Sequence, residues 1–276
     1  NASLSNVVST KTPTTVDVEF HGRPPRLVNA HIALFGQNGD ILIVMRDLTR
    51  EQAIEKMRSD FVANASHEMR TPLATIIGSI ETLQGAAKND PKARDMFLTT
   101  MLSQSHRMKR LIDDLLTLSR IELNEHVRPN GRVALLNVLK QAKANLAQQA
   151  LDLKVSFILS GDPELTVAGD ADELMQVAQN LIENAIKYGG DGGKVELSCS
   201  VRGSEAVFAV KDFGKGIADV HLPRLTERFY RVSTQESRAR GGTGLGLAIV
   251  KHILLRHRGK LDISSKPGEG STFTVS

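Results

Sequence analysis

The sequence predicts a multidomain α+β protein made of three unlike segments. Residues 1–48 carry alternating and continuous apolar runs that are typical of β-strands. Residues 51–123 carry two long stretches with apolar side chains at helical spacing, separated by one turn. From residue 132 to the end, helix and strand patterns alternate, which predicts a layered α/β domain.

The composition indicates a globular protein and argues against nucleic-acid binding by base stacking. With 276 residues, 41% of them hydrophobic and 24% charged, the chain is typical of a globular protein. Aromatic residues make up only 4%, and the net charge of +4 is mild, so we expect no nucleic-acid partner that binds through base stacking. The single cysteine, Cys199, cannot form an intrachain disulfide, which fits a reducing compartment.

The sequence carries no membrane or secretion signal. No apolar run approaches the roughly 20 residues of a membrane helix, and no signal peptide is present. The chain opens with Asn1 rather than Met, and its first segment reads as incomplete. We therefore expect a cytoplasmic portion of a longer protein.

The first segment predicts a β-hairpin that leads into a helix. Two apolar runs, 27–35 and 41–45, flank a turn that contains Asn-Gly at 38–39, a strong hairpin signal. Thr49 and Gln52 have the spacing of a capping box, so we expect a helix to begin there.

Two long helices are expected next, over residues 51–85 and 91–123, with Pro91 at the first position of the second helix. Their apolar stripes repeat at 3-4-3 spacing: Leu73, Ile76, Ile80 and Leu83 in the first, and Met108, Leu111, Leu115 and Leu118 in the second. Such coiled-coil-like seams cannot both be buried in one antiparallel hairpin. Two hairpins can bury them in a four-helix bundle, which predicts a homodimer.

The first long helix contains a predicted phosphoryl-transfer arrangement. Thr71 lies one helical turn from His67 on the same face. An imidazole has a pKa of about 6.5, so at neutral pH one ring nitrogen carries an open lone pair. Glu68 can take or hold the proton of the other nitrogen, which activates the nucleophile. Pro72 lacks an N–H and costs an interior helix about 3 kcal/mol, so the turn beside His67 is expected to be loosened.

The last segment alternates helices and strands. Helices are expected near 134–149, 171–187 and 244–257, and strands near 155–159, 165–168, 194–201, 206–212, 260–265 and 271–275. A polar loop of about 28 residues precedes the last helix and is too long for a simple connection, so we expect a lid.

One helical face of this domain predicts a cation and phosphate site. Asn180, Asn184, Lys187 and Tyr188 share that face. Amide oxygens suit a hard cation such as Mg²⁺, and a nearby lysine suits phosphate. An ordinary polar helix surface is the alternative, but it would carry fewer asparagines, which are poor helix formers.

Two glycine-rich motifs complete the predicted site. In Asp212-Phe213-Gly214-Lys215-Gly216-Ile217, the carboxylate can accept a hydrogen bond from an adenine amino group, and the glycines let the backbone approach the base. In Gly241-Gly242-Thr243-Gly244-Leu245-Gly246-Leu247, glycine-rich backbone opens a helix, whose free N–H groups and dipole favour phosphate.

Together these motifs carry a family resemblance. The octet Ser66-His67-Glu68-Met69-Arg70-Thr71-Pro72-Leu73 resembles the H box of sensor histidine kinases, in which the histidine is phosphorylated from ATP. The three later motifs resemble, in order and spacing, the N box and the two glycine boxes of the ATP domain of that family. That domain has the Bergerat fold shared with gyrase, the Hsp90 chaperone and MutL-type ATPases. Arg228-Phe229-Tyr230-Arg231 resembles the F box, whose second arginine reaches the phosphates.

The resemblance, which covers residues 51–276, implies a set of site residues. The catalytic residues would be His67, Glu68 and Thr71, and Mg²⁺ would be held by Asn180 and Asn184. ATP would be bound by these and by further residues: Asn180, Asn184, Lys187, Tyr188, Asp212, Gly214, Gly216, Ile217, Arg231, Thr243, Gly244, Leu245, Gly246 and Leu247.

The resemblance also implies domains and partners. Residues 50–127 would be the helical-hairpin dimerisation and phosphotransfer domain, and 132–276 the catalytic ATP-binding α/β sandwich. Separately, Asp47-Leu48-Thr49 resembles the ending of a PAS sensor domain, so residues 1–49 would be a partial PAS-like sensor segment. His67 would be phosphorylated from Mg-ATP and would pass the group to an aspartate of a response-regulator receiver domain, with Thr71 serving dephosphorylation of the regulator. The chain would be the cytoplasmic portion of a bacterial sensor anchored in the inner membrane through a segment that this chain does not contain.

The chain also has a narrower likeness within this family. Three stretches look like the phosphate-regulon sensor kinases: residues 222–232, residues 61–65 before the H box, and residues 243–252 followed by Arg256-His257. A Bergerat-fold ATPase that works by conformational change is disfavoured, because its relatives carry a glutamate where this chain has Asn180. A non-catalytic dimeric scaffold is disfavoured because His67, Asn184 and Asp212 are all present. The PAS-like segment could equally be a plain β-hairpin that binds no ligand.

Overall fold

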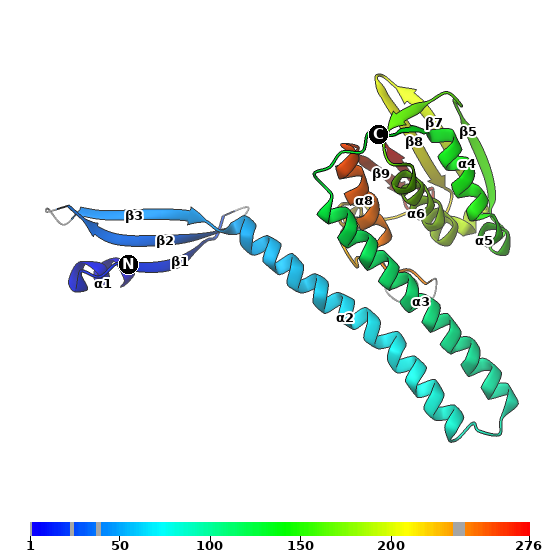
Figure 1. Ribbon diagram of the computed structural model, residues 1–276, viewed down its shortest axis with the longest axis horizontal. Coiled ribbons are helices and arrows are strands. Elements are labelled where there is room, and N and C mark those ends of the chain that lie inside the picture. The colour runs from blue at the N-terminus through cyan, green and yellow to red at the C-terminus, as the bar shows by residue number, and fades with distance from the viewer. Residues whose placement is uncertain (1, 23–24, 37–39, 234–240) are drawn as a thin grey trace. The chain divides into compact units, whose positions relative to one another are not determined.

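The computed structural model describes residues 2–22, 25–36, 40–233 and 241–276 (Figure 1). The described residues form two compact units, which divide between Glu68 and Met69, and each unit has its own internal packing. Among the described residues, no helix is long and apolar enough to cross a membrane.

The first unit begins with a helix, α1 (Ala2–Thr10), and continues as an antiparallel sheet in the order β1-β2-β3. The strands are β1 (Thr14–Phe20), β2 (Arg26–Phe35) and β3 (Asp40–Asp47). The expectation of β structure throughout residues 1–48 is wrong for α1, which packs against β2 and buries Val7 completely. Tertiary contact with the sheet outweighs the weak helix propensity of a Val-Val-Ser-Thr run.

The predicted hairpin is confirmed. β2 and β3 pair in register up to Phe35 opposite Asp40. The Asn-Gly pair at 38–39, on which this prediction rested, lies outside the described residues.

Helix α2 (Thr49–Gln84) begins where it was expected, but by a different cap. The backbone N–H of Thr49 donates to Asp47 Oδ1 (2.9 Å). Hydrogen bonds from the side chain of Thr49 and, to a smaller extent, from its backbone N–H lower the pKa of the Asp47 carboxyl. The Thr49 hydroxyl instead accepts from the N–H of Leu27 on β2 (3.0 Å), so it does not close a capping box with Gln52. The helix continues through Pro72 without ending.

Helix α3 (Pro91–Leu123) starts as predicted, with Pro91 at its first turn and Asp90 accepting from the N–H groups of Lys92 and Ala93. Its strongest packing is against α8 (Gly246–His257). Leu111 and Leu118 of the predicted stripe are therefore buried within the single chain. The α2 stripe stays open, because Leu73 is 46% and Ile80 is 41% exposed.

The C-terminal domain contains a mixed five-stranded sheet in the order β5-β7-β8-β10-β9. Its strands are β5 (Ser156–Gly161), β7 (Lys194–Arg202), β8 (Glu205–Asp212), β9 (Leu261–Lys266) and β10 (Gly270–Val275), with only β5 and β7 parallel. Helices α4 (Leu135–Asn145), α6 (Ala171–Gly189) and α8 pack against the sheet (Figure 1). The predicted α/β sandwich is confirmed.

Two boundaries in this domain differ from the expected ones. The helix expected at 134–149 is strand β4 (Arg132–Ala134), then α4, then α5 (Ala147–Asp152). β4 pairs with β6 (Thr166–Ala168), a contact across more than 30 residues that a local pattern does not reveal. A short 3-10 turn, η1 (Gly190–Gly192), ends α6, and a second, η2 (Asp219–Arg224), lies within the long polar loop, of which residues 234–240 lie outside the description.

Candidate functional site

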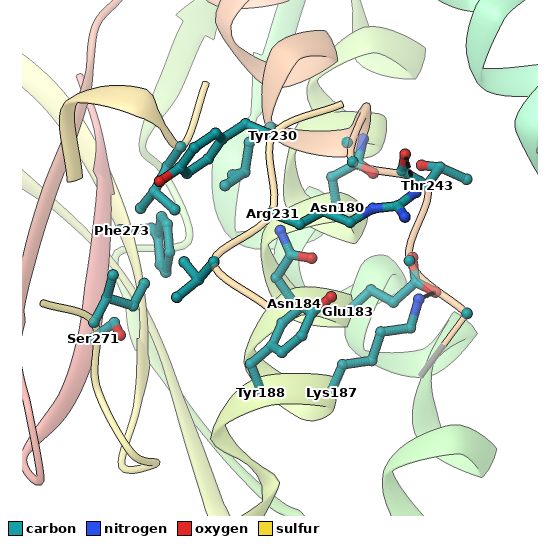
Figure 2. A pocket seen from close by; sticks show the side chains of 18 of the residues that line it. Asn180, Glu183, Asn184, Lys187, Tyr188, Tyr230, Arg231, Thr243, Ser271 and Phe273 are labelled. Atoms are coloured by element: carbon teal, nitrogen blue, oxygen red, sulfur yellow. Dashed lines mark hydrogen bonds and ion pairs between the residues drawn. The ribbon is translucent and has the colours of Figure 1, made fainter. Parts of the chain in front are cut away.

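A cavity of about 310 Å³ lies within the second unit, in the range typical of small-molecule sites (Figure 2). Its walls come from α6, the loop after β8, the glycine-rich loop before α8, strand β10 and helix α3. Most of the predicted binding residues line it: Asn180, Asn184, Lys187, Tyr188, Asp212, Gly216, Ile217, Arg231, Thr243, Gly244, Gly246 and Leu247.

The remaining predicted residues lie elsewhere. Gly214 and Leu245 do not line the cavity. Leu245 is completely buried, and Gly214 lies against the backbone of Tyr188 and Gly189. Both residues therefore pack next to the residues that line the cavity. His67, Glu68 and Thr71 belong to α2, and the first two belong to the other unit.

Helix α6 presents one polar face to the cavity because its other face is apolar and buried. Asp170 caps the helix by accepting from the N–H groups of Asp172 and Glu173. Leu181, Ile182 and Ile186 are among the side chains that pack into the core. The side chains of Asn180, Asn184, Lys187 and Tyr188 are left facing the cavity (Figure 2).

Glu183 lies on the same face and was not predicted. Lys187 Nζ forms an ion pair with Glu183 Oε1 (2.7 Å), one helical turn away. The lysine that was expected to meet phosphate thus contacts a carboxylate in this structure.

At one end of the cavity lies the buried carboxyl of Asp212, which is 5% exposed. Its Oδ1 accepts from the backbone N–H groups of Gly214 (3.0 Å) and Ser271 (3.3 Å). Burial raises the pKa of the Asp212 carboxyl, and the hydrogen bonds from Gly214 and Ser271 partly offset that rise. Ser271 and Phe273 of β10 complete this end and were missed by sequence reasoning.

Two glycines of these motifs make close approaches to the chain's own backbone, while the predicted approach to a base stays a prediction. Gly216 has φ +67°, and a Cβ there would collide with the backbone carbonyl of Lys266. Gly244 has φ +76°, and a Cβ there would lie 2.9 Å from Phe229 Cα, whose N–H donates to the Gly244 carbonyl (2.8 Å). Only glycine adopts these conformations without strain.

The other end of the cavity is polar and lies at the start of α8. Arg231 donates to the backbone carbonyl of Thr243 (2.7 Å), and the Leu245 N–H donates to the Thr243 hydroxyl (3.3 Å). The N-terminus of a helix favours anions, because its backbone N–H groups and dipole point outward.

Helix α3 also reaches this end, which sequence reasoning missed. Arg110, Asp113 and Asp114 line the cavity, and the Thr243 hydroxyl donates to Asp114 Oδ2 (2.7 Å). Burial raises the pKa of the Asp114 carboxyl, the hydrogen bond from Thr243 lowers it, and nearby Glu183 raises it further. In the sequence these residues look like an ordinary charged helix surface, so no local signal marks them.

Part of the long polar loop forms a wall of the cavity. Tyr230 lines the cavity, and its hydroxyl is hydrogen-bonded to His221 Nδ1 (2.7 Å). The Arg224 guanidinium lies 4.2 Å from the centre of the Tyr230 ring. That this loop moves as a lid stays a prediction.

The donors at the polar end fit a phosphate-bound cation. The Asn180 amide oxygen lies 2.9 Å from where a Cβ on Gly246 would be, so the glycine backbone forms a cradle against this side chain. Among the described residues, no three His, Cys, Asp or Glu side chains are grouped as metal ligands. A cation here would be held by the amide oxygens of Asn180 and Asn184 together with the phosphates of its ligand.

Comparison with known proteins identifies two domain families in this chain. Residues 57–124 match the His Kinase A (phospho-acceptor) domain, HisKA. Residues 169–276 match the histidine kinase-, DNA gyrase B- and HSP90-like ATPase domain, HATPase_c. The first match contains the predicted phospho-acceptor, and the second contains α6, Asp212 and the glycine-rich loop.

Relatives match over nearly the whole chain. It is 42% identical to the phosphate regulon sensor protein PhoR of Pseudomonas aeruginosa, over 88% of this chain and 55% of PhoR. It is 33% identical to the sensor protein SrrB of Staphylococcus aureus, over 94% of this chain and 45% of SrrB. The chain thus spans about half the length of these relatives.

Solved structures of histidine kinases share the fold. The Acinetobacter baumannii histidine kinase AdeS matches with a TM-score of 0.59 and 28% identity, over 76% of this chain and 95% of AdeS. Full-length ShkA in complex with AMPPNP matches with a TM-score of 0.57 and 26% identity, over 78% of this chain and 45% of ShkA. With its phospho-acceptor domain, its ATPase domain and its similarity to PhoR, the chain belongs to the sensor histidine kinases.

Proposed function

We propose that this chain is the kinase portion of a dimeric sensor that phosphorylates His67 from Mg-ATP and transfers the phosphoryl group to a response-regulator aspartate. One observation carries the proposal: a single cavity joins the polar face of α6, the Asp212 carboxyl and the glycine-rich start of α8. The domain limits 50–127 and 132–276 and the site residues are part of the proposal.

The cavity has chemically distinct ends that fit the two ends of ATP. At the Asp212 end, a buried carboxyl acceptor suits an adenine amino group. At the α8 end, backbone N–H groups and Arg231 suit phosphates, and Asn180 and Asn184 offer oxygens to Mg²⁺. The structure of the related kinase ShkA contains AMPPNP, which supports nucleotide binding by this fold.

The proposed chemistry is an in-line phosphoryl transfer. A ring nitrogen of His67 attacks the γ-phosphorus, an N–P bond forms, and the P–O bond to the leaving ADP breaks. Glu68 takes or holds the proton of the other ring nitrogen, a contribution of about 10²–10⁴-fold in such reactions. The remaining catalysis would come from positioning and from charge stabilisation by Arg231, Lys187 and Mg²⁺.

Homodimerisation through the α2 and α3 hairpins is part of the proposal. It is supported by the exposed apolar side chains of α2, among them Leu73, Ile77 and Ile80, which would be buried in a four-helix bundle. The response-regulator partner and a role in phosphate signalling are proposed from the likeness to PhoR. Attachment to a membrane stays a prediction, and the first segment stays either a PAS-like sensor or a β-hairpin that binds no ligand.

Incubation with ATP labelled in the γ-phosphate tests the proposal. We expect label on the protein that is lost in acid and retained in alkali, as for phosphohistidine, and that maps to the peptide containing His67. Release of labelled inorganic phosphate without a labelled protein would instead indicate an ATPase of the related families.

A further inference from the structure

Helix α3 places a carboxylate on the hydroxyl that the phosphates would need. Thr243 lies in the glycine-rich turn before α8, and its hydroxyl donates to Asp114 Oδ2 (2.7 Å). The same threonine is held by Arg231 through its carbonyl and by the Leu245 N–H through its hydroxyl. Asp114 thus occupies the hydrogen-bonding position that an anionic phosphate oxygen would otherwise take.

The charge that α3 adds to the cavity is net negative and opposes a polyphosphate. Asp113 and Asp114 of α3 line the cavity together with one cation of that helix, Arg110, and Glu183 from α6 belongs to the same lining. Glu183 already engages Lys187 in an ion pair. While α3 lies here, an incoming phosphate meets these carboxylates together with the cations that would bind it.

Further contacts outside the cavity hold α3 in this place. Arg228, in the loop that carries Arg231, donates to Glu122 near the end of α3. Arg256 of α8 donates to the carbonyl of Val127, just beyond α3 (2.8 Å). Leu118, buried completely, adds an apolar contact surface. The docked helix is therefore held by polar contacts on both elements that border the phosphate end.

We propose that α3 is an autoinhibitory element in which Asp114 competes with the nucleotide phosphates for Thr243, so that docking of α3 and binding of nucleotide oppose each other. The inference rests on the proposed nucleotide site. By linkage, each contact that holds α3 down weakens nucleotide binding, and bound nucleotide weakens the docking by the same factor. Signals that reach α3 through the hairpin could then change nucleotide affinity without touching the cavity.

Isothermal titration of the whole chain with ADP tests the competition. Asp114→Ala removes the competitor, and Glu122→Gln removes the charge from a contact outside the cavity and so weakens it. Both should tighten ADP binding, by about fivefold or more. Asp95→Asn is the control, because it removes the same charge from an exposed position on α3. Unchanged or weaker ADP binding by Asp114→Ala and Glu122→Gln would overturn the inference.

A distance measurement reports docking separately from affinity. Spin labels are attached to cysteines replacing Leu116 on α3 and Leu151 on α5, which are 62% and 70% exposed, whereas the native Cys199 is buried. ADP should broaden or lengthen the distance distribution, and Glu122→Gln should do so without ADP. An unchanged distribution in a protein that binds ADP would refute the competition alone. Failure of all variants to bind ADP would refute the nucleotide site and the competition together.

Discussion

Replacing Asp212 by asparagine should reverse the hydrogen-bonding direction at one end of the cavity. Asp212 Oδ1 accepts from the N–H groups of Gly214 and Ser271. An amide NH₂ in that place would oppose two donors, so the asparagine oxygen must take the Oδ1 position. The NH₂ group then replaces Oδ2, the oxygen left to meet an adenine amino group, and sets a donor against a donor.

The size of the effect follows from this geometry. A hydrogen bond to a charged acceptor contributes about 1.5–3 kcal/mol, so ADP affinity should fall about 10- to 150-fold. A guanine base presents a carbonyl oxygen where adenine presents its amino group. The variant should therefore lose less affinity for GDP than for ADP, or gain affinity for GDP.

The thermal stability of Asp212→Asn, unlike its ADP affinity, should not fall. Because burial raises the pKa of the Asp212 carboxyl in the folded protein, its ionisation costs the fold stability as pH rises above the ordinary aspartate range, about pH 4. Asparagine removes that cost and keeps the acceptor for Gly214 and Ser271. The Tm of Asp212→Asn at neutral pH should therefore equal or exceed that of the wild type.

Titration calorimetry with ADP and GDP, together with melting curves at pH 4 and pH 7, measures these effects. Asp219→Asn, an exposed change in the neighbouring 3-10 turn, is the matched control. ADP affinity equal to that of the wild type would show that Asp212 does not contact the adenine. A lower Tm together with weaker binding would assign the loss to damaged structure instead.

Three further substitutions test other parts of the proposal. His67→Gln should abolish labelling from γ-labelled ATP and leave ADP affinity nearly unchanged, since His67 lies outside the cavity. His106→Gln, the control, should retain the label. An equal loss of ADP affinity in His67→Gln would contradict the separation of nucleophile and nucleotide. Thr71→Ala should keep autophosphorylation and lose most dephosphorylation of purified phospho-regulator. Thr75→Ala, one turn further along α2, is the control. A decay rate of the phospho-regulator that Thr71→Ala leaves unchanged would reject a role of Thr71 in dephosphorylation. Gly216→Ala should destabilise the fold by about 1–3 kcal/mol, because its φ of +67° and its close backbone contact exclude a Cβ, and an unchanged melting curve would count against that strain.

The sequence was sufficient wherever the signal was local. Asp90 with Pro91 marked the start of α3, and in the structure Asp90 caps this helix and Pro91 lies in its first turn. Asn180 and Asn184 share a face because helical geometry alone places residues four apart together. The glycine motifs were equally readable, since a positive φ or a close backbone approach leaves glycine as the fitting residue.

The sequence did not reveal contacts between residues that lie far apart in the chain. Ser271 reaches the Asp212 carboxyl because β10 pairs with β8 in a register that sets these two residues opposite each other. Asp114 reaches Thr243 because α3 packs along α8, although 128 residues separate the two side chains. No pattern within a few residues encodes such a pairing, because it depends on how whole elements bury their apolar faces against one another. The residues that could bind a nucleotide are therefore recognisable in the chain, whereas the carboxylate that opposes binding appears only when the helices pack.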